Sequence, residues 1–179
     1  ETDLATMKRL GSPTASPDGK TIAYQLQETD LPANKRRTDI YVSWLDMTTE
    51  SGIKIASEPG SNEHSPAFSD DGKALYFISN KSGTDQLYRI ASNKGPLNID
   101  PVAEQISNFK TDISGFKISP DGKKVAIWGD VARECDSFDC EKDGDRSKPG
   151  SGTGREYDAL MVRHWDSWET PGNYSRIFT

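Results

Sequence analysis

The chain has 179 residues, 33% hydrophobic and 28% charged, and its 28 acidic and 22 basic side chains give a formal net charge of −6. A negative field opposes binding to phosphate backbones, which excludes nucleic acid as an expected partner. No stretch approaches the ~18 consecutive apolar residues of a membrane span, and residues 1–4 show no signal-peptide pattern, so membrane insertion is not expected either. The 15 Gly and 10 Pro favour many short strands joined by turns.

A short motif recurs three times along the chain. It reads Ser-Pro-Asp-Gly-Lys at residues 16–20 and 119–123, and Ser-Asp-Asp-Gly-Lys at residues 69–73. Successive glycines of the motif are 53 and 50 residues apart, a period typical of propeller blades. Because Asp bonds its own backbone and Gly supplies a positive φ, each copy predicts a hairpin turn. The predicted turn residues are Asp18, Gly19, Asp71, Gly72, Asp121 and Gly122.

Strand-like segments surround each turn in the same order. In the first unit, residues 1–57, strands are expected at 13–15, after the turn up to about Gln25, at 39–44 and at 53–57. In the second unit, residues 58–107, the corresponding strands are expected at 66–68, after the turn up to Ser79, at 86–90 and at 102–107. The third unit, residues 108–179, repeats them at 113–118, up to Trp128, at 157–162 and at 175–179. Four strands per unit predict a propeller blade.

Two insertions interrupt this pattern. Residues 131–155 separate the second and third expected strands of the third unit, and their polar, glycine-rich sequence indicates a mobile surface loop. Residues 28–38 occupy the matching position of the first unit, and we interpret Lys35-Arg36-Arg37 as an exposed loop tip. Both insertions are expected on one face of the propeller.

The predicted fold is therefore all-β: one partial β-propeller of about three four-stranded blades, with TolB-like or WD40-like repeats. Propellers close with 4–8 blades, so three leave both outer flanks open. We expect either further chain in the natural protein or association of several copies into a homo-oligomer.

The two cysteines, Cys135 and Cys140, lie five positions apart in the longer insertion. From spacing alone they form a small disulfide ring, bind metal with outside help, or remain free thiols. His64 and His164 are poorly placed to complete a zinc site. A disulfide would imply an oxidising compartment, so a periplasmic or secreted location is expected.

The repeat resembles that of TolB-type proteins and of the prolyl oligopeptidase family. Residues 157–168, which contain Arg163-His164-Trp165-Asp166, resemble a segment of the bacterial dipeptidyl-peptidase and acylaminoacyl-peptidase members of that family. The cysteine-bearing loop and residues 4–13 are also similar, so the resemblance spans essentially the whole chain.

This resemblance implies an N-terminal propeller that covers an α/β-hydrolase domain with a Ser, Asp and His triad. That hydrolase domain is absent from these residues, since no Gly-x-Ser-x-Gly nucleophile elbow occurs among them. We assign no catalytic residue. The expected role is to gate the access of peptide substrates to the hydrolase domain of the same parent chain. The alternative is a TolB-like propeller that binds other proteins and performs no reaction.

Two groups of residues resemble known catalytic or metal-binding patterns. His164 and Asp166 match two members of a triad, but the neighbouring tryptophans favour a packed blade corner. The acidic run over residues 136–145 offers oxygen ligands, but its spacing fails the EF-hand pattern and favours a solvated loop. No metal or cofactor is expected.

Overall fold

The structure, a computed structural model, describes residues 2–45, 52–91, 102–140, 163–164, 167–168 and 173–179. Apart from one short helix, its regular elements are all strands, and no described helix is long and apolar enough to cross a membrane. In chain order they are α1 (Thr2–Thr6), β1 (Arg9–Ala15), β2 (Thr21–Asp30), β3 (Lys35–Trp44), β4 (Ile53–Ala56), β5 (Glu63–Phe68), β6 (Ala74–Ser79), β7 (Gln86–Ala91), β8 (Glu104–Gln105), β9 (Gly115–Ile118), β10 (Val125–Ala132), β11 (Arg163–His164), β12 (Ser167–Trp168) and β13 (Asn173–Phe178).

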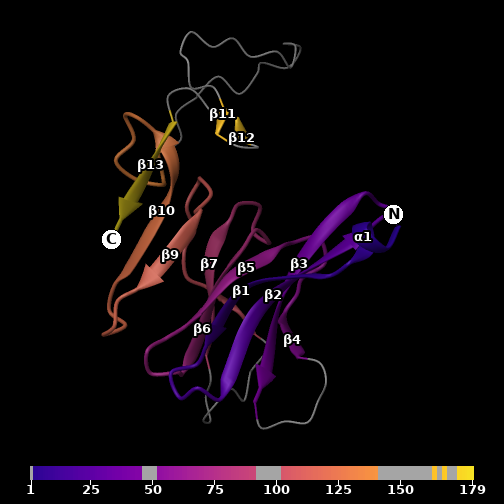
Figure 1. Cartoon of the computed structure of the whole chain (residues 1–179). Helices are drawn as coiled ribbons and strands as arrows, with labels where there is room; N and C mark the ends of the chain where they lie inside the picture. Colours follow the sequence, from indigo (N-terminus) through magenta and orange to yellow (C-terminus); the bar gives the residue numbers. More distant parts are fainter. Residues whose placement is uncertain (1, 46–51, 92–101, 141–162, 165–166, 169–172) are drawn as a thin grey trace, which may run out of the picture.

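The strands form three antiparallel blades that stand side by side (Figure 1). Blade 1 has the order β1-β2-β3-β4, blade 2 the order β5-β6-β7-β8, and blade 3 the order β9-β10-β13. The short pair β11-β12 is a separate two-stranded sheet. The expected all-β fold of successive blades is confirmed, and the strands of blades 1 and 2 occur in the predicted order.

The third blade differs from the prediction. Strand β13 pairs with β10 over six residues, from Ile127 opposite Phe178 to Ala132 opposite Asn173. The expectation of a third strand at 157–162 and a fourth at 175–179 is therefore wrong, because the segment at 173–178 takes the third place. Residues 157–162 themselves lie outside the described residues.

The smaller insertion also differs from the prediction. Strands β2 and β3 pair without interruption from Thr21 opposite Trp44 to Asp30 opposite Lys35. Residues 28–38 are therefore an extension of the hairpin, closed by a four-residue turn at 31–34. Lys35-Arg36-Arg37 begins strand β3 and is not a loop tip. The polar side chains and β-branched threonines of this extension suit a strand pair that is partly exposed to solvent.

The blades have two distinct edges (Figure 1). The turn edge holds the connections β1–β2, β5–β6 and β9–β10, which are the three repeat turns. The hairpin edge holds the connections β2–β3 and β6–β7 together with the end of β10. The segments that follow β2 and β10 thus leave the blades at the same edge, as expected.

Each repeat turn is held by the same set of hydrogen bonds. In the first turn the Ser16 hydroxyl donates to Asp18 Oδ1 at 2.6 Å and accepts from the N–H of Thr21 at 3.0 Å. The N–H of Lys20 donates to the same Asp18 oxygen at 3.1 Å, and Gly19 has φ 70°. The other two turns repeat these bonds, led by Ser69 and Ser119. This network explains why serine, aspartate and glycine recur at fixed offsets.

The serine and backbone donors stabilise the ionised aspartate in every turn. Hydrogen bonding from the serine hydroxyl, and next from the lysine N–H, lowers the pKa of Asp18, Asp71 and Asp121 below the ordinary value. A carboxyl with a depressed pKa in the folded state stabilises the fold above its ordinary pKa. That contribution is lost as the pH falls through the depressed value.

The core lies in the two seams between the blades. Along β6, Leu75 and Phe77 face blade 1, while Tyr76 and Ile78 face blade 3. The seam between blades 1 and 2 also buries Ala23, Ile40, Val42, Ile55, Tyr88 and Ile90. The seam between blades 2 and 3 also buries Leu87, Ile113, Ile127, Val131, Cys135 and Phe138. Blade 2 is thus covered on both faces and blades 1 and 3 on one.

The start of the longer insertion belongs to this core. Phe138 is 1% exposed and its ring lies 5.5 Å from Phe109 and 4.9 Å from Phe178, measured between centroids. The Arg176 side chain donates to the carbonyl of Cys135 at 2.6 Å. The expectation of a mobile loop is wrong for residues 131–140, because residues 131–132 end strand β10 and residues 133–140 pack against blade 3. Residues 141–155 lie outside the described residues.

Removing the turn serine tests the role of the repeat. Ser16→Ala deletes the acceptor of a buried N–H, so we expect a loss of about 1 kcal/mol in the free energy of unfolding. We also expect the pKa of Asp18 to rise towards its ordinary value, measured by NMR titration. Ser82→Ala is the matched control, because that hydroxyl is exposed and makes only a 3.4 Å contact. An unchanged Asp18 titration in Ser16→Ala would contradict this account of the turn.

Candidate interaction surfaces

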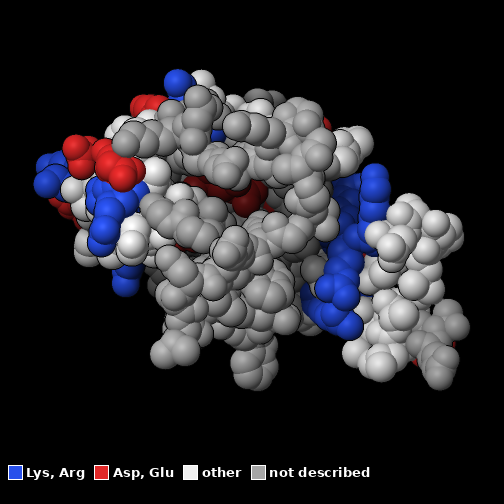
Figure 2. Space-filling model, turned by 90° about the horizontal axis from the view of Figure 1, so that it is seen from above, with Lys and Arg blue, Asp and Glu red and all other residues white. Residues whose placement is uncertain are grey.

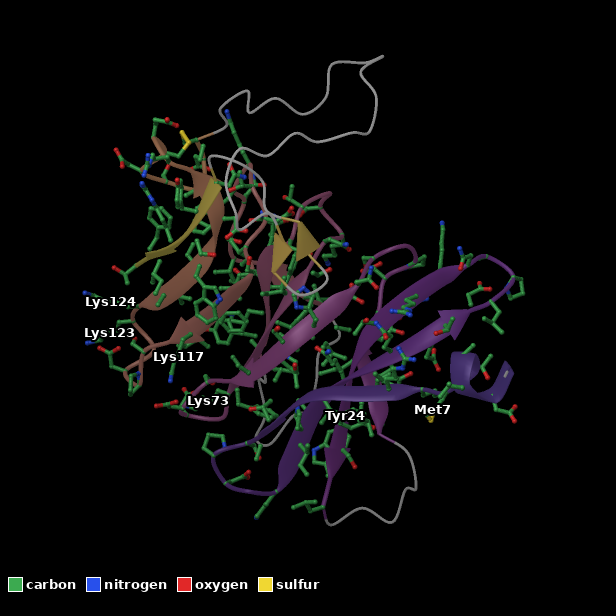
Figure 3. The ribbon with its side chains drawn as sticks, turned by 45° about the horizontal axis from the view of Figure 1, so that its top comes forward. Met7, Tyr24, Lys73, Lys117, Lys123 and Lys124 are labelled. Carbon is green, nitrogen blue, oxygen red and sulfur yellow. A yellow bond between two sulfur atoms is a disulfide. The ribbon has the colours of Figure 1, made fainter. Side chains whose placement is uncertain are left out.

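The turn edge carries exposed lysines with acidic neighbours. Figure 3 shows Lys73, Lys117, Lys123 and Lys124 on the same side of blades 2 and 3. Lys73 Nζ lies 3.8 Å from the carboxylate of Asp71 in the same turn. Since each repeat turn also contributes at least one aspartate, the formal charges of this edge largely cancel. The turn edge therefore does not form a concentrated cationic field.

The hairpin edge is more strongly charged. Figure 2, which looks onto this edge, shows Lys and Arg side chains gathered in a stripe on the side of blade 1, and mixed charges at the blade 3 end. Part of this positive charge is internally paired around Asp39, whose side chain is fully buried. Arg37 Nε lies 3.0 Å from Asp39 Oδ1, and Lys54 Nζ lies 2.7 Å from Oδ2. The hydrogen bond to Asp39 raises the pKa of Lys54.

Sequence reasoning missed this cluster. Arg37 was read only as part of a basic tip, and Asp39 as the start of a strand. Arg37 and Asp39 share a face of β3, and the pairing of β4 adds Lys54, which lies opposite Tyr41. The spacing of Arg37 and Asp39, two apart on a strand, is the one signal that was available.

The outer face of blade 3 exposes large apolar side chains. Trp128 and Ile177 are opposite one another on β10 and β13, and they are 37% and 72% exposed. Gly115 on β9 lies beneath the Trp128 ring, since a Cβ at this position would clash with that ring. These two side chains lie beside the polar pair Asp130 and Ser175, and exposed apolar groups of this size favour contact with other protein.

The outer side of blade 1 is similar. Met7 and Leu10 are 54% and 72% exposed, and Leu10 lies opposite Leu26 in the sheet. Figure 3 shows Met7 and Tyr24 on one side of this blade. The ring of Tyr24 stacks on that of Tyr41, with 5.8 Å between centroids. Both ends of the three-blade stack therefore expose apolar surface.

The remaining predicted site residues lie in the segment that follows β10 and in the β11-β12 pair. Cys135 and Cys140 form a disulfide with 5.4 Å between their Cα atoms. Arg163 and His164 pair with Trp168 and Ser167 in the short β11-β12 hairpin. Trp165 and Asp166 lie outside the described residues, so the arrangement of His164 and Asp166 stays a prediction.

The structure brings together no set of metal ligands in the part of the chain that it describes. No group of three or more His, Cys, Asp or Glu side chains is close enough to hold a metal ion there. Of the acidic run, Asp136 lies 3.6 Å from Arg176, and residues 141–145 are outside the described ranges. The exposed apolar side chains of the two outer blade faces are suited to packing against other protein.

Comparison with known proteins agrees with this architecture. Dipeptidyl-peptidase 5 of Porphyromonas gingivalis is 35% identical over 163 residues, which cover 91% of this chain and 22% of that protein. The chain therefore spans about a fifth of the length of this curated relative. An acylaminoacyl peptidase solved in complex with Z-Gly-Gly-Phe-chloromethyl ketone has a TM-score of 0.64 and 18% identity, covering 97% of this chain and 23% of that one.

The propeller domain of the trilobed protease from Pyrococcus furiosus is also similar, with a TM-score of 0.50 and 21% identity over 70% of this chain and 35% of that one. These structural likenesses show the fold. The family model described as the TolB beta propeller domain matches residues 4–135. With three blades built on one repeat and a family match over most of its length, this chain belongs to the TolB beta propeller domain family.

Proposed function

We propose that this chain is the propeller part of an exported serine peptidase, and that its blades restrict the active site to short or unfolded peptides. The observation that carries the proposal is the homology of nearly the whole chain to a dipeptidyl-peptidase that is several times longer. The peptide bond would be hydrolysed by an activated serine on a separate hydrolase domain of the parent chain. These residues would contribute walls and loops, and no reacting group.

The seams between blades support a gating role. Gln86 is fully buried and its amide joins blade 2 to the strand-free segment before blade 3. Its Nε2 donates to the carbonyl oxygens of Phe109 and Thr111 at 3.1 and 3.2 Å, and its Oε1 accepts from Phe109 N–H at 2.9 Å. Such a clamp keeps neighbouring blades in contact, so that large molecules cannot pass between them.

Weakening the contact between blades 2 and 3 tests whether the propeller restricts the access of peptides. In the protein that contains this propeller, Gln86→Ala removes several buried hydrogen bonds worth about 1 kcal/mol each. We expect it to raise the rate of hydrolysis of a long unfolded peptide severalfold relative to that of a chromogenic dipeptide substrate. Lys123→Ala, on an exposed turn, is the control and should leave the ratio unchanged. An unchanged ratio in a folded Gln86→Ala variant would contradict gating.

The binding-scaffold alternative makes a different prediction for the same protein. A TolB-like scaffold would hydrolyse neither substrate and would not react with a serine-directed inhibitor. Peptide hydrolysis that this inhibitor abolishes supports the peptidase proposal, whereas its complete absence from the intact protein overturns it.

Export to an oxidising compartment is supported by the Cys135–Cys140 disulfide. In protein purified from its natural compartment, we expect no alkylation of these cysteines before reduction and two added alkyl groups after it. Intact-mass measurement checks this. Alkylation of both thiols without reduction would contradict the proposal of a periplasmic or secreted location.

A further inference from the structure

The β2-β3 hairpin of blade 1 is longer than its counterpart in blade 2. Strands β2 and β3 have 10 residues each, whereas β6 and β7 have 6. The last four pairs, from Gln27 opposite Thr38 to Asp30 opposite Lys35, therefore continue past the point where the blade 2 hairpin ends. At about 3.4 Å per residue they extend the hairpin by roughly 14 Å. We call this extension, residues 27–38, the arm.

One face of the arm pairs its acidic side chains with basic ones. Residues that are directly opposite in an antiparallel pair, and alternate residues along a strand, share a face. Glu28 and Asp30 lie opposite Arg37 and Lys35 on this face. Glu28 Oε1 also lies 2.6 Å from Lys8 Nζ. The charges of this face are thus largely compensated within blade 1.

The opposite face of the arm is basic and uncompensated. It carries Arg36 on β3 with Gln27 and Thr29 on β2, and the pairing of β1 adds Arg9 opposite Gln27. Every acidic residue of β1, β2 and β3 lies on the other face. Arg9 and Arg36 are exposed, and neither makes an ion pair or a side-chain hydrogen bond within the described part of the chain. Both guanidinium groups are therefore available to an anion.

Blade 2 supplies no carboxylate to these arginines. Where it meets the base of the arm, the Thr38 N–H donates to Asn62 Oδ1 at 3.0 Å, and this asparagine is neutral. The next residue, Glu63, is 1% exposed, and its Oε1 accepts from the hydroxyls of Ser61 and Ser79. Figure 2 accordingly shows Lys and Arg side chains gathered in a stripe on the blade 1 side of this edge.

The spacing of the two arginines suits more than one carboxylate. Arg9 and Arg36 belong to β1 and β3, which flank β2, so their backbones are about 10 Å apart across the sheet. An extended peptide spans that distance in about three residues. A guanidinium group donates two parallel hydrogen bonds to a carboxylate, and Gln27 and Thr29 between the arginines add neutral hydrogen-bonding groups. With a net charge of −6 over the chain, an acidic ligand is repelled elsewhere and attracted here.

We propose that the Arg9 and Arg36 face of the arm binds the carboxylate groups of acidic peptides. The inference rests on the proposed function, since peptides are the molecules that the parent enzyme admits. Arg9 and Arg36 each donate to a carboxylate of the peptide, supplied by Asp or Glu side chains or by its carboxyl terminus. The arm thereby selects acidic peptides at the hairpin edge of the propeller.

Equilibrium binding to the intact protein that contains this propeller tests the proposal. Fluorescence anisotropy compares a labelled, carboxyl-amidated peptide rich in Asp and Glu with its Asn and Gln counterpart, after a serine-directed inhibitor has blocked cleavage. We expect tighter binding of the acidic peptide, weakened about fivefold in Arg9→Gln/Arg36→Gln, because exposed charge pairs each contribute modestly. Lys123→Gln/Lys124→Gln removes two exposed charges from the turn edge and is the matched control, which should change the affinity little.

A third peptide separates the two sources of carboxylate. It has no acidic side chain and a free carboxyl terminus, so binding that depends on Arg9 and Arg36 assigns the terminal carboxylate as a ligand. Equal affinities for all three peptides would overturn the proposal. So would an unchanged affinity for the acidic peptide in the double arginine variant. Arg36→Gln alone provides the test if the double variant has a lowered unfolding midpoint.

Failure of this inference is distinguishable from failure of the proposed function. Hydrolysis of a neutral peptide by the uninhibited protein, without any preference of the arm for carboxylates, refutes the acidic-peptide site and leaves the peptidase proposal intact. Absence of hydrolysis refutes the peptidase proposal, while the anisotropy measurement still decides whether the arm binds acidic peptides.

Discussion

The packing of one sheet against the next is the interaction on which this structure depends. Blade 2 buries both faces, since alternate residues of β6 such as Phe77 and Ile78 point into opposite seams. Each fully buried side chain of this size contributes about 1.5–3 kcal/mol, and no blade has a core of its own. A blade is therefore stable only between neighbours, which is the physical basis of repeat architectures. Blades 1 and 3 each bury one face, so their outer faces are the natural places for further protein.

Polar groups set how the blades meet. The serine and aspartate of each repeat turn fix the angle at which the first two strands of a blade join, and Gln86 and Asn62 carry hydrogen bonds across the seams. These groups are buried or hydrogen-bonded to the backbone. They therefore fix the position of each strand and blade relative to its neighbour, whereas apolar packing alone would allow several positions. This arrangement gives a stack of hydrogen-bonded blades with charged hairpins at one edge. Glu63 is an exception, because its buried Oε2 has no hydrogen-bond partner among the described residues.

Local signals were predictable from the sequence, and long-range pairings were not. The turns at Gly19, Gly72 and Gly122 follow from a motif only a few residues long, and the strands of blades 1 and 2 follow from the alternating segments around it. The pairing of β13 with β10 joins residues 41 to 51 positions apart, and an equally alternating run at 157–162 competes with it in the sequence. Likewise, nothing local distinguishes Glu63 from an exposed glutamate, because its burial depends on Ser79 and on the neighbouring blade. The propeller could be inferred from the sequence, but the Asp39 cluster and the burial of Glu63 required the structure.

The central claim is that these blades form a continuous part of a larger propeller whose other blades cover both flanks. Hydroxyl-radical footprinting of the intact protein, read by mass spectrometry, tests it most directly. Trp128 and Ile177 on the outer face of blade 3 should be oxidised much more slowly than Leu45, which is 65% exposed, after correction for the intrinsic reactivity of each residue type. Rates for Trp128 and Ile177 that match those of freely exposed residues would show that nothing covers this flank, and would contradict the account.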